Sequence, residues 1–193
     1  MTAAPDAVVV RPAQASEAAD VAWLAATTFP LACPPGTSAD EIARHIAAHL
    51  APADFRAWAV SPDDALLVAA REDQLLGYAL LHLGMPAGED EALVLARATG
   101  SDGPSVELSK IYAHPLSLGA GSSSSLMRGA IEAAVSLSAS HGYPAGLPLW
   151  LGTNARNLRA QAFYRKHGFA VVGTRTYDVG GHLHDDVVMV HRD

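Results

Sequence analysis

The segment from residue 105 to residue 141 constrains the fold of this chain more than any other part of it. A strand is predicted over 105–113, a short loop of small residues follows, and a long helix with one apolar side is predicted over 121–141. Glycines let a backbone approach a ligand closely, and the first turn of a helix presents free N–H groups with a partial positive charge. The segment therefore predicts an α/β fold with a loop suited to phosphate or pyrophosphate.

The remaining patterns place this segment within one mixed α/β sheet. A strand, two helices and a β-hairpin are predicted before it, and a strand, a helix and two strands after it. The 193 residues and the 50% hydrophobic content suit a single domain spanning residues 1–193. The predicted strands cover 8–10, 65–71, 75–83, 105–113, 149–152, 170–179 and 185–190, and the predicted helices cover 16–28, 38–50, 121–141 and 157–167. Ser16 is expected to cap the first helix, and Ser38 with Glu41 is expected to form a capping box at the start of the second.

Charge and hydrophobicity exclude several classes of protein. The net charge is −7, so the surface repels phosphate backbones and nucleic acid is not an expected partner. An acidic surface weakly favours cationic substrates, although many proteins are acidic simply because charge keeps them soluble. No apolar run approaches the roughly 18 residues of a membrane helix, so no membrane partner is expected. The N-terminus carries Asp6 and Arg11 and no basic-then-apolar leader, so we expect a cytoplasmic location.

Cysteine and histidine usage argues against a metal centre. Cys33 is the only cysteine, which excludes a disulfide framework and a cysteine-based zinc site. A catalytic acyl-carrying role for Cys33 is less favoured than that of a packed loop residue. His182 and His184 could bind a metal at a strand turn, but the sequence places no third ligand beside them. We therefore expect no metal.

The glycine- and serine-rich loop differs from two other phosphate-binding motifs. A P-loop requires Gly-Lys followed by Ser or Thr, and no such sequence follows the glycines. A dinucleotide-binding fold would have a third glycine near position 124, where this chain has Ser124. It would also have an acidic residue about twenty positions on, where this chain has His141 and Gly142. An ordinary loop without a ligand stays an alternative for this segment taken alone.

A second motif begins at Asn157 and reads Asn-Leu-Arg-Ala-Gln-Ala-Phe-Tyr-Arg-Lys-His-Gly-Phe. Asn157 is well placed to cap the predicted helix, and Gly168 is well placed to end it. Ala160 and Tyr164 are spaced to share one face of that helix. Taken alone, a tyrosine at this position is more often a core residue with its hydroxyl at the rim.

Together, in this order and spacing, the two motifs resemble the GNAT superfamily of acyl-CoA-dependent N-acetyltransferases over about residues 8–190. The family pattern Asn-x-x-Ala-x-x-Phe-Tyr-x-Lys-x-Gly-Phe is complete in the second motif. The loop pattern Gln/Arg-x-x-Gly-x-Gly/Ala falls on Leu118, Gly121 and Ser123, so the central glycine matches and the two flanking positions depart from the pattern. The resemblance implies a central mixed sheet of about seven strands with helices on both faces.

The resemblance also implies acetyl-CoA as the cosubstrate and a small-molecule primary amine as the acceptor, with direct acetyl transfer. The tail near residues 179–186 and the hairpin ending at Gly77-Tyr78 look like the polyamine (spermidine/spermine) branch. Loop amides would bind the pyrophosphate, strand amides would bind the pantetheine amides and the developing oxyanion, and asparagines would border the pantetheine arm. The implied cofactor-binding residues are Ile111, Tyr112, Ala113, Leu118, Gly119, Ala120, Gly121, Ser122, Ser123, Asn154, Asn157 and Tyr164.

Two side chains are candidates for proton transfer in such a reaction. An alkylammonium with a pKa near 10.4 must lose a proton before it attacks, and Glu107 is the candidate base. The alternative is that Glu107 is a strand glutamate paired with Lys110 or another cation. Tyr164 matches the family residue that supplies a proton to the leaving thiolate. Asp185 and Asp186 are second choices that would attract a cationic substrate.

Two other functions stay open. A non-catalytic acyl-CoA-binding sensor or partner module would keep the cofactor cleft without efficient chemistry; Leu118 favours it, whereas Tyr164 and Glu107 argue against it. Acetylation of a protein lysine or N-terminus would need an open acceptor groove. A homodimer and a monomer are both compatible with the sequence.

Overall fold

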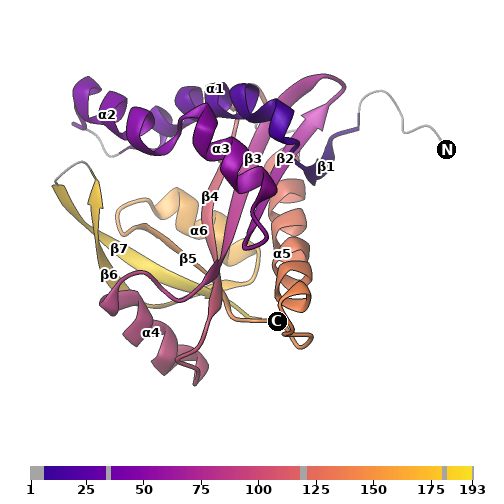
Figure 1. The fold of residues 1–193 in the computed structure, drawn as a ribbon. Coiled ribbons are helices and arrows are strands. Elements are labelled where there is room, and N and C mark those ends of the chain that lie inside the picture. The colour runs from indigo at the N-terminus through magenta and orange to yellow at the C-terminus, as the bar shows by residue number, and fades with distance from the viewer. Residues whose placement is uncertain (1–6, 34–35, 118–120, 180–181, 193) are drawn as a thin grey trace. The chain divides into compact units, whose positions relative to one another are not determined.

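The computed structural model describes residues 7–33, 36–117, 121–179 and 182–192. It confirms a mixed α/β fold, with a seven-stranded sheet in the order β1-β2-β3-β4-β5-β7-β6 (Figure 1). Short 3-10 turns cover Ala15–Glu17, Phe29–Leu31 and Pro115–Ser117. The strands and helices are β1 (Val9–Pro12), α1 (Ala18–Thr28), α2 (Ala39–His49), α3 (Pro52–Val60), β2 (Asp64–Arg71), β3 (Gln74–Gly84), α4 (Glu89–Thr99), β4 (Ser105–Ala113), α5 (Ser122–Ser140), β5 (Leu149–Asn154), α6 (Leu158–Lys166), β6 (Phe169–Val179) and β7 (His182–His191).

The chain forms two compact units. The first comprises Met1–Leu80 with Lys110–Ala130, and the second comprises Leu81–Ser109 with Ile131–Asp193. The strands β3 and β4 and the helix α5 therefore contribute residues to both units.

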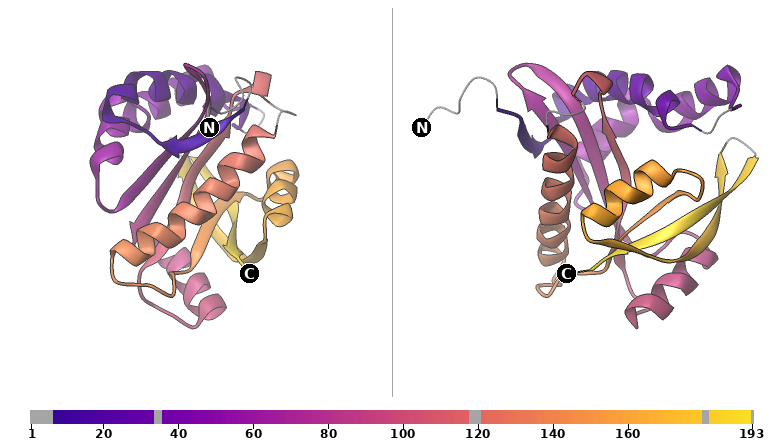
Figure 2. Two further views of the ribbon diagram at one scale, coloured as in Figure 1. Left: turned by 90° about the vertical axis from the view of Figure 1, so that its right-hand side faces the viewer. Right: turned by 180° about the vertical axis from the view of Figure 1, so that it is seen from behind.

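In the first unit, β1 pairs antiparallel with β2, and helices cover both faces of these strands. On one face, α1 and α3 enclose a core in which Phe55 and Tyr78 are fully buried, with their rings edge to face at 5.5 Å. On the other face, Leu67 and Val10 contact α5 at Gly129, where a methyl group would lie 2.7 Å from a Val10 methyl carbon. Figure 2 shows α5 on the side of β2 and β3 opposite to α1. The alternation of strand side chains thus builds two apolar layers.

In the second unit, β4 pairs parallel with β5, and β7 pairs antiparallel with both β5 and β6. The helices α4 and α6 lie on opposite faces of β5, β7 and β6 (Figures 1 and 2). Beneath α4, Leu95 is buried in one apolar cluster with Trp150, Val188 and Val190. This cluster attaches α4 to the sheet.

Several predicted helix boundaries are confirmed, and one cap is not. Ser38 caps α2 through its side chain, which accepts from the Glu41 amide at 3.2 Å, while the Glu41 carboxylate accepts from the Ser38 amide at 2.7 Å. Ser16, in contrast, does not begin α1. A 3-10 turn precedes that helix, and Gln14 precedes the turn, with its amide donating to Glu17 at 2.8 Å.

The patterns in the sequence did not predict α3 and α4. The helix α4 lies between Gly88 and Gly100, in a stretch whose glycines and prolines indicate a loop. The structure uses these glycines as helix ends: Gly88 is the N-cap, and Gly100 ends the helix with a φ of +73°. The acidic first turn of α4 was the signal that could have found it.

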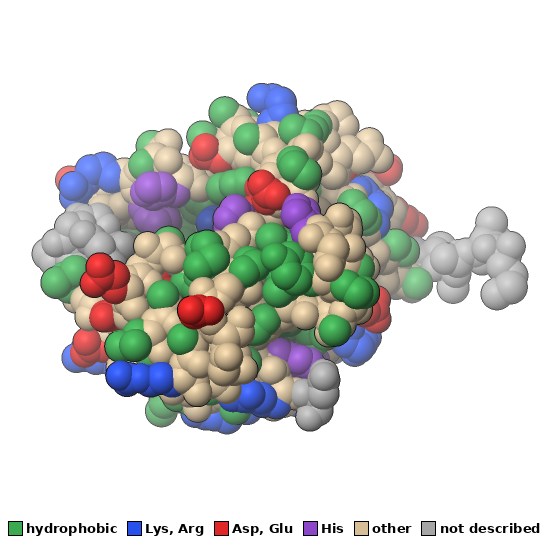
Figure 3. Space-filling model, turned by 60° about the horizontal axis from the view of Figure 1, so that its bottom comes forward, with side chains coloured by type: hydrophobic (Ala, Val, Ile, Leu, Met, Phe, Trp, Pro, Cys, Tyr) green, Lys and Arg blue, Asp and Glu red, His purple; other side chains and the backbone are tan. Residues whose placement is uncertain are grey.

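The surface carries side chains of every kind. The face drawn in Figure 3 has hydrophobic, acidic, basic and histidine side chains side by side. Among the helices of the described ranges, none combines the length and the apolar character needed to cross a membrane.

Gly77 of β3 lies where the chain tolerates no side chain. A methyl group there would lie 2.8 Å from the Tyr112 carbonyl oxygen and 3.3 Å from both the Ala113 Cα and a Leu126 methyl carbon. Because backbone atoms of β4 cannot move aside without disturbing the strand, we expect Gly77→Ala to lower the free energy of unfolding by about 1–3 kcal/mol. Urea denaturation measures this change. Gly103→Ala is the control, because its methyl group would meet its nearest atom at 3.5 Å, an ordinary contact. Equal stability of the two variants would contradict the close approach.

Candidate active site

The predicted strand and loop contributions to the site belong to the first unit. Ile111, Tyr112 and Ala113 form the end of β4 and are half-buried. The Tyr112 ring stacks on Tyr78, with ring centroids 5.5 Å apart and planes 20° apart. This stacking fixes the end of β4 against β3. The predicted residues Leu118, Gly119 and Ala120 lie outside the described residues.

A chain of serine hydroxyl groups connects β3 to the start of α5. The Ser117 hydroxyl donates to the His114 carbonyl at 2.7 Å and also lies 3.2 Å from the Leu76 carbonyl. The Ser122 hydroxyl donates to the Ser117 carbonyl at 2.9 Å, and Ser122 is only 1% exposed. Ser122 therefore holds the helix start in place with its side chain, and its contribution to an anion would come from its backbone amide.

The helix α5 begins as the sequence predicts. Gly121 has a φ of +77°, a left-handed conformation that favours glycine, and its carbonyl accepts the Ser125 amide at 2.9 Å. An α-helix leaves the amides of its first turn without acceptors inside the helix, here including those of Ser122 and Ser123. These N–H groups and the helix dipole suit a phosphate group.

The predicted asparagines belong to the second unit, at the junction of β5 and α6. The Asn157 side-chain oxygen accepts the Ala160 amide at 3.0 Å, which confirms the predicted cap. The Asn154 side-chain oxygen accepts the Arg156 amide at 2.9 Å. Each oxygen thus has a structural role, and the NH₂ group of each side chain is the part that could bind the pantetheine arm.

Tyr164 lies on α6, half-buried, with its ring edge-on to Phe169 at 6.1 Å between centroids. Burial raises the pKa of Tyr164 to about 12 because the ionised phenolate loses its water. At neutral pH the hydroxyl is therefore protonated and can donate.

Glu107 lies on β4 in the second unit, opposite Trp150 of β5. Its carboxylate oxygen Oε1 is 3.8 Å from Nη1 of Arg175, and its side chain is 28% exposed. The ammonium of Lys110 lies over the Trp58 ring, 4.9 Å from the ring centroid. Glu107 thus lies beside a cation, as the alternative interpretation expected, and Arg175 is one such cation.

The two second-choice aspartates differ in their surroundings. Asp186 is 6% exposed and lies 3.7 Å from the Arg175 guanidinium, whereas Asp185 is exposed and its carbonyl accepts the Ala155 amide at 2.9 Å. Sequence reasoning missed Arg175 as the neighbour of Glu107 and Asp186. An arginine at an alternating position of a strand gives no signal that its side chain is buried.

Neither metal nor thiol chemistry gains support from the described residues. Within them, no three His, Cys, Asp or Glu side chains are arranged to hold a metal ion, and the side chains of His182 and His184 fall outside that set. The Cys33 thiol lies 3.4 Å from the Phe29 carbonyl, to which it donates, and burial raises the pKa of this thiol. A raised pKa leaves little thiolate, so Cys33 fits a packed loop residue.

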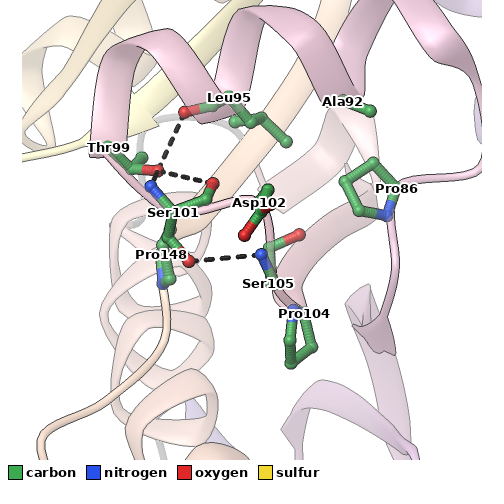
Figure 4. Close-up of a pocket in the computed structure, with 10 residues that line it drawn as sticks. Pro86, Ala92, Leu95, Thr99, Ser101, Asp102, Pro104, Ser105 and Pro148 are labelled. Carbon is green, nitrogen blue, oxygen red and sulfur yellow. Dashed lines mark hydrogen bonds between the residues drawn. The ribbon is translucent and has the colours of Figure 1, made fainter.

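A small pocket lies elsewhere in the second unit, between the end of α4 and the start of β4 (Figure 4). Its volume is about 60 Å³, enough for a few water molecules only. The hydroxyl of Thr99 donates to the Leu95 carbonyl at 2.8 Å on its rim. None of the predicted site residues lines this pocket, whose lining consists of Pro86, Ala92, Leu95, Thr99, Ser101, Asp102, Gly103, Pro104, Ser105 and Pro148.

Comparisons with known proteins identify the family of this chain. The sequence profile of the acetyltransferase (GNAT) family matches residues 31–169. Uncharacterized N-acetyltransferases of Mycobacterium bovis and Mycobacterium tuberculosis are 37% identical over 175 residues, which cover 91% of this chain and 97% of each relative. The chain therefore belongs to the acetyltransferase (GNAT) family, and it is an enzyme of the acyltransferase class.

Solved structures share the fold at low sequence identity. The PaiA N-acetyltransferase of Thermoplasma acidophilum, in complex with coenzyme A, has a TM-score of 0.70 at 16% identity and covers 97% of this chain and 99% of its own. NAA60 of Arabidopsis thaliana, in complex with acetyl-CoA, has a TM-score of 0.68 at 15% identity and covers 96% of this chain and 98% of its own.

The cap at Asn157 gives a prediction about the stability of the fold. Asn157→Ala removes the acceptor for the Ala160 amide and is expected to lower the free energy of unfolding by about 1 kcal/mol. Asn157→Asp keeps an acceptor oxygen and is expected to keep the stability, although it removes the NH₂ donor. Urea denaturation of both variants tests the cap, and an alanine variant as stable as the wild type would disprove it.

Proposed function

We propose that this enzyme transfers the acetyl group of acetyl-CoA directly to a primary amine on a small molecule, of which a polyamine is the favoured example. The observation that carries the proposal is the complete motif on α6, with Asn157 capping the helix and the protonated Tyr164 on it. The family membership and the coenzyme A and acetyl-CoA complexes of similar folds support it. The proposal includes a cytoplasmic location, with a monomer or a homodimer as the assembly.

Most of the contacts to the cofactor would come from backbone groups. The amides of 119–123 would bind the pyrophosphate, and the backbone of 111–113 would bind the pantetheine amides. The NH₂ groups of Asn154 and Asn157 would border the pantetheine arm. Leu118 stands where the family pattern has glutamine or arginine, and a leucine side chain cannot donate a hydrogen bond to a phosphate. The backbone amides would therefore have to bind the pyrophosphate without help from that side chain.

The chemistry needs one proton acceptor and one proton donor. The amine reaches the site as an ammonium ion, and Glu107 would take its proton directly or through water. The amine nitrogen then forms a bond to the acetyl carbonyl carbon, and an amide of 111–113 would stabilise the oxyanion. As the C–S bond breaks, the Tyr164 hydroxyl would give a proton to the coenzyme A thiolate. The new amide nitrogen would then lose its second proton to the Tyr164 phenolate, directly or through water, which restores the hydroxyl.

The cationic acceptor is supported by the charge of the chain. A net charge of −7 favours the approach of positively charged amines. A polyamine carries several such charges and a primary amine at each end. Peptide amines are the competing acceptors, and the assay below includes them.

The direct test incubates the protein with acetyl-CoA and a panel of spermidine, spermine, simple alkylamines and lysine-containing peptides. We expect acetylated polyamine, detected by mass spectrometry. Acetyl-CoA at about 100 times its Kd should also stabilise the fold by about 2.7 kcal/mol, which raises the Tm. An unchanged Tm at millimolar acetyl-CoA would remove the cofactor from the proposal. Binding without transfer to any amine would favour the non-catalytic module.

Tyr164→Phe tests the proton donor. Removal of a general acid typically costs about 10²-fold or more in rate, so we expect kcat to fall by that factor while the Kd of coenzyme A changes much less. Steady-state kinetics and calorimetric titration measure the two quantities. Tyr143→Phe, a change on an exposed loop, is the matched control. A kcat close to that of the wild type would exclude Tyr164 from the acid role.

A further inference from the structure

A buried arginine in the second unit is surrounded by carboxylates from three other elements. The guanidinium of Arg175, on β6, has Nη1 3.6 Å from Oε1 of Glu91 on α4 and 3.8 Å from Oε1 of Glu107 on β4. Its Nη2 is 3.7 Å from Oδ2 of Asp186 on β7. Strand pairing places Asp186 directly opposite Arg175. Three strands and a helix thus meet at one side chain.

The sheet is shaped to hold this guanidinium. Arg175 lies over the Trp150 ring, with Cζ 5.3 Å from the ring centroid. Two residues further along β5, Gly152 leaves the space that the guanidinium fills. A methyl group at Gly152 would lie 2.5 Å from Cζ and 2.7 Å from Nε of Arg175. No side chain fits at position 152 while Arg175 keeps this conformation.

The helix α4 brings a second fixed carboxylate to the guanidinium. Oε1 of Glu91 accepts the Gly88 amide at 2.9 Å, which holds the Glu91 side chain in place at the start of the helix. The side chains of Glu91 and Asp186 are 10% and 9% exposed, whereas that of Glu107 is 28% exposed. The two buried carboxylates therefore hold the guanidinium, and Glu107 is the most accessible of its three partners.

We propose that Arg175 is a positioning residue for acetyl transfer, which holds the Glu107 carboxylate in place and in its ionised form. The inference rests on the proposed function, which makes Glu107 the base. A base must be ionised to accept a proton, and a neighbouring cation favours the ionised form of a carboxylate. Without the guanidinium, Glu107 would share this region with Glu91 and Asp186, and repulsion among three carboxylates would favour its protonated form.

The pH dependence of kcat/KM tests this role. Arg175→Met should move the acid limb of the profile to higher pH by about one unit or more. Arg175→Lys keeps a positive charge and should move the limb less. A residue that only supports the fold would lower activity without moving the limb. Arg192→Met is the matched control, because Arg192 also contacts α4, through the Ala98 carbonyl at 3.1 Å; its limb should stay in place.

A second background shows whether Arg175 acts through Glu107. Glu107→Gln removes the titrating group, so adding Arg175→Met to it should cause no further movement of the limb. An acid limb that stays in place in Arg175→Met, or that moves equally in the Glu107→Gln background, would overturn the proposal.

A second variant is available if Arg175→Met does not fold, and an NMR titration measures the pKa of Glu107 without enzyme turnover. If Arg175→Met is too unstable, Arg175→Met/Glu91→Gln removes one of the carboxylates left without the guanidinium and should restore the fold, with a smaller shift in the same direction. Carbon-13 NMR of the glutamate carboxyl groups, with Glu107 assigned through Glu107→Gln, should show its pKa raised in either variant. If no amine is acetylated, the proposed function fails, whereas this titration still shows whether Arg175 keeps Glu107 ionised; an unchanged Glu107 pKa would reject that effect.

Discussion

The burial of one positive charge organises the second unit. A guanidinium that is 8% exposed is stable only where carboxylates compensate it, and Arg175 obtains them from α4, β4 and β7. The neutral surroundings contribute as well, through the Trp150 ring beneath the guanidinium and the absence of a side chain at Gly152. Removing one partner of a buried ion pair is strongly destabilising because it leaves a buried charge uncompensated. Since Arg175 pairs with Glu91 of α4 and with Glu107 of β4, it links the position of α4 on the sheet to that of Glu107.

Aromatic packing and hydrogen bonds hold the elements of the first unit together. Aromatic rings of Phe55, Tyr78 and Tyr112 pack against one another beneath α1 and α3, and serine hydroxyls connect the strand end to α5. Ring packing and neutral hydrogen bonds depend little on pH or salt. The backbone amides proposed to bind the pyrophosphate thus belong to a framework of packed rings and neutral hydrogen bonds, whereas the proposed base lies beside a buried arginine.

Local signals in the sequence predicted the features that depend on neighbouring residues. The Ser38 capping box, the Asn157 cap and the stop at Gly168 each involve groups within a few positions of one another. Features that depend on distant partners were missed. The helix α4 has its ends marked by glycines that also suit a loop, and Arg175 acquires its meaning only from carboxylates that the sheet brings beside it. Periodicity places a residue on a face, but it does not identify what lies opposite.

Gly152 has a consequence for how this protein can evolve. A larger residue there excludes the arginine at 175, and a smaller residue at 175 leaves three carboxylates uncompensated and a void over Trp150. Either replacement alone is unfavourable, so lineages should exchange both positions together or neither, and the acidic partners should follow. We therefore expect these residues to change as a set, and a protein that lost them would need another cation to keep the carboxylate proposed as the base at position 107 ionised.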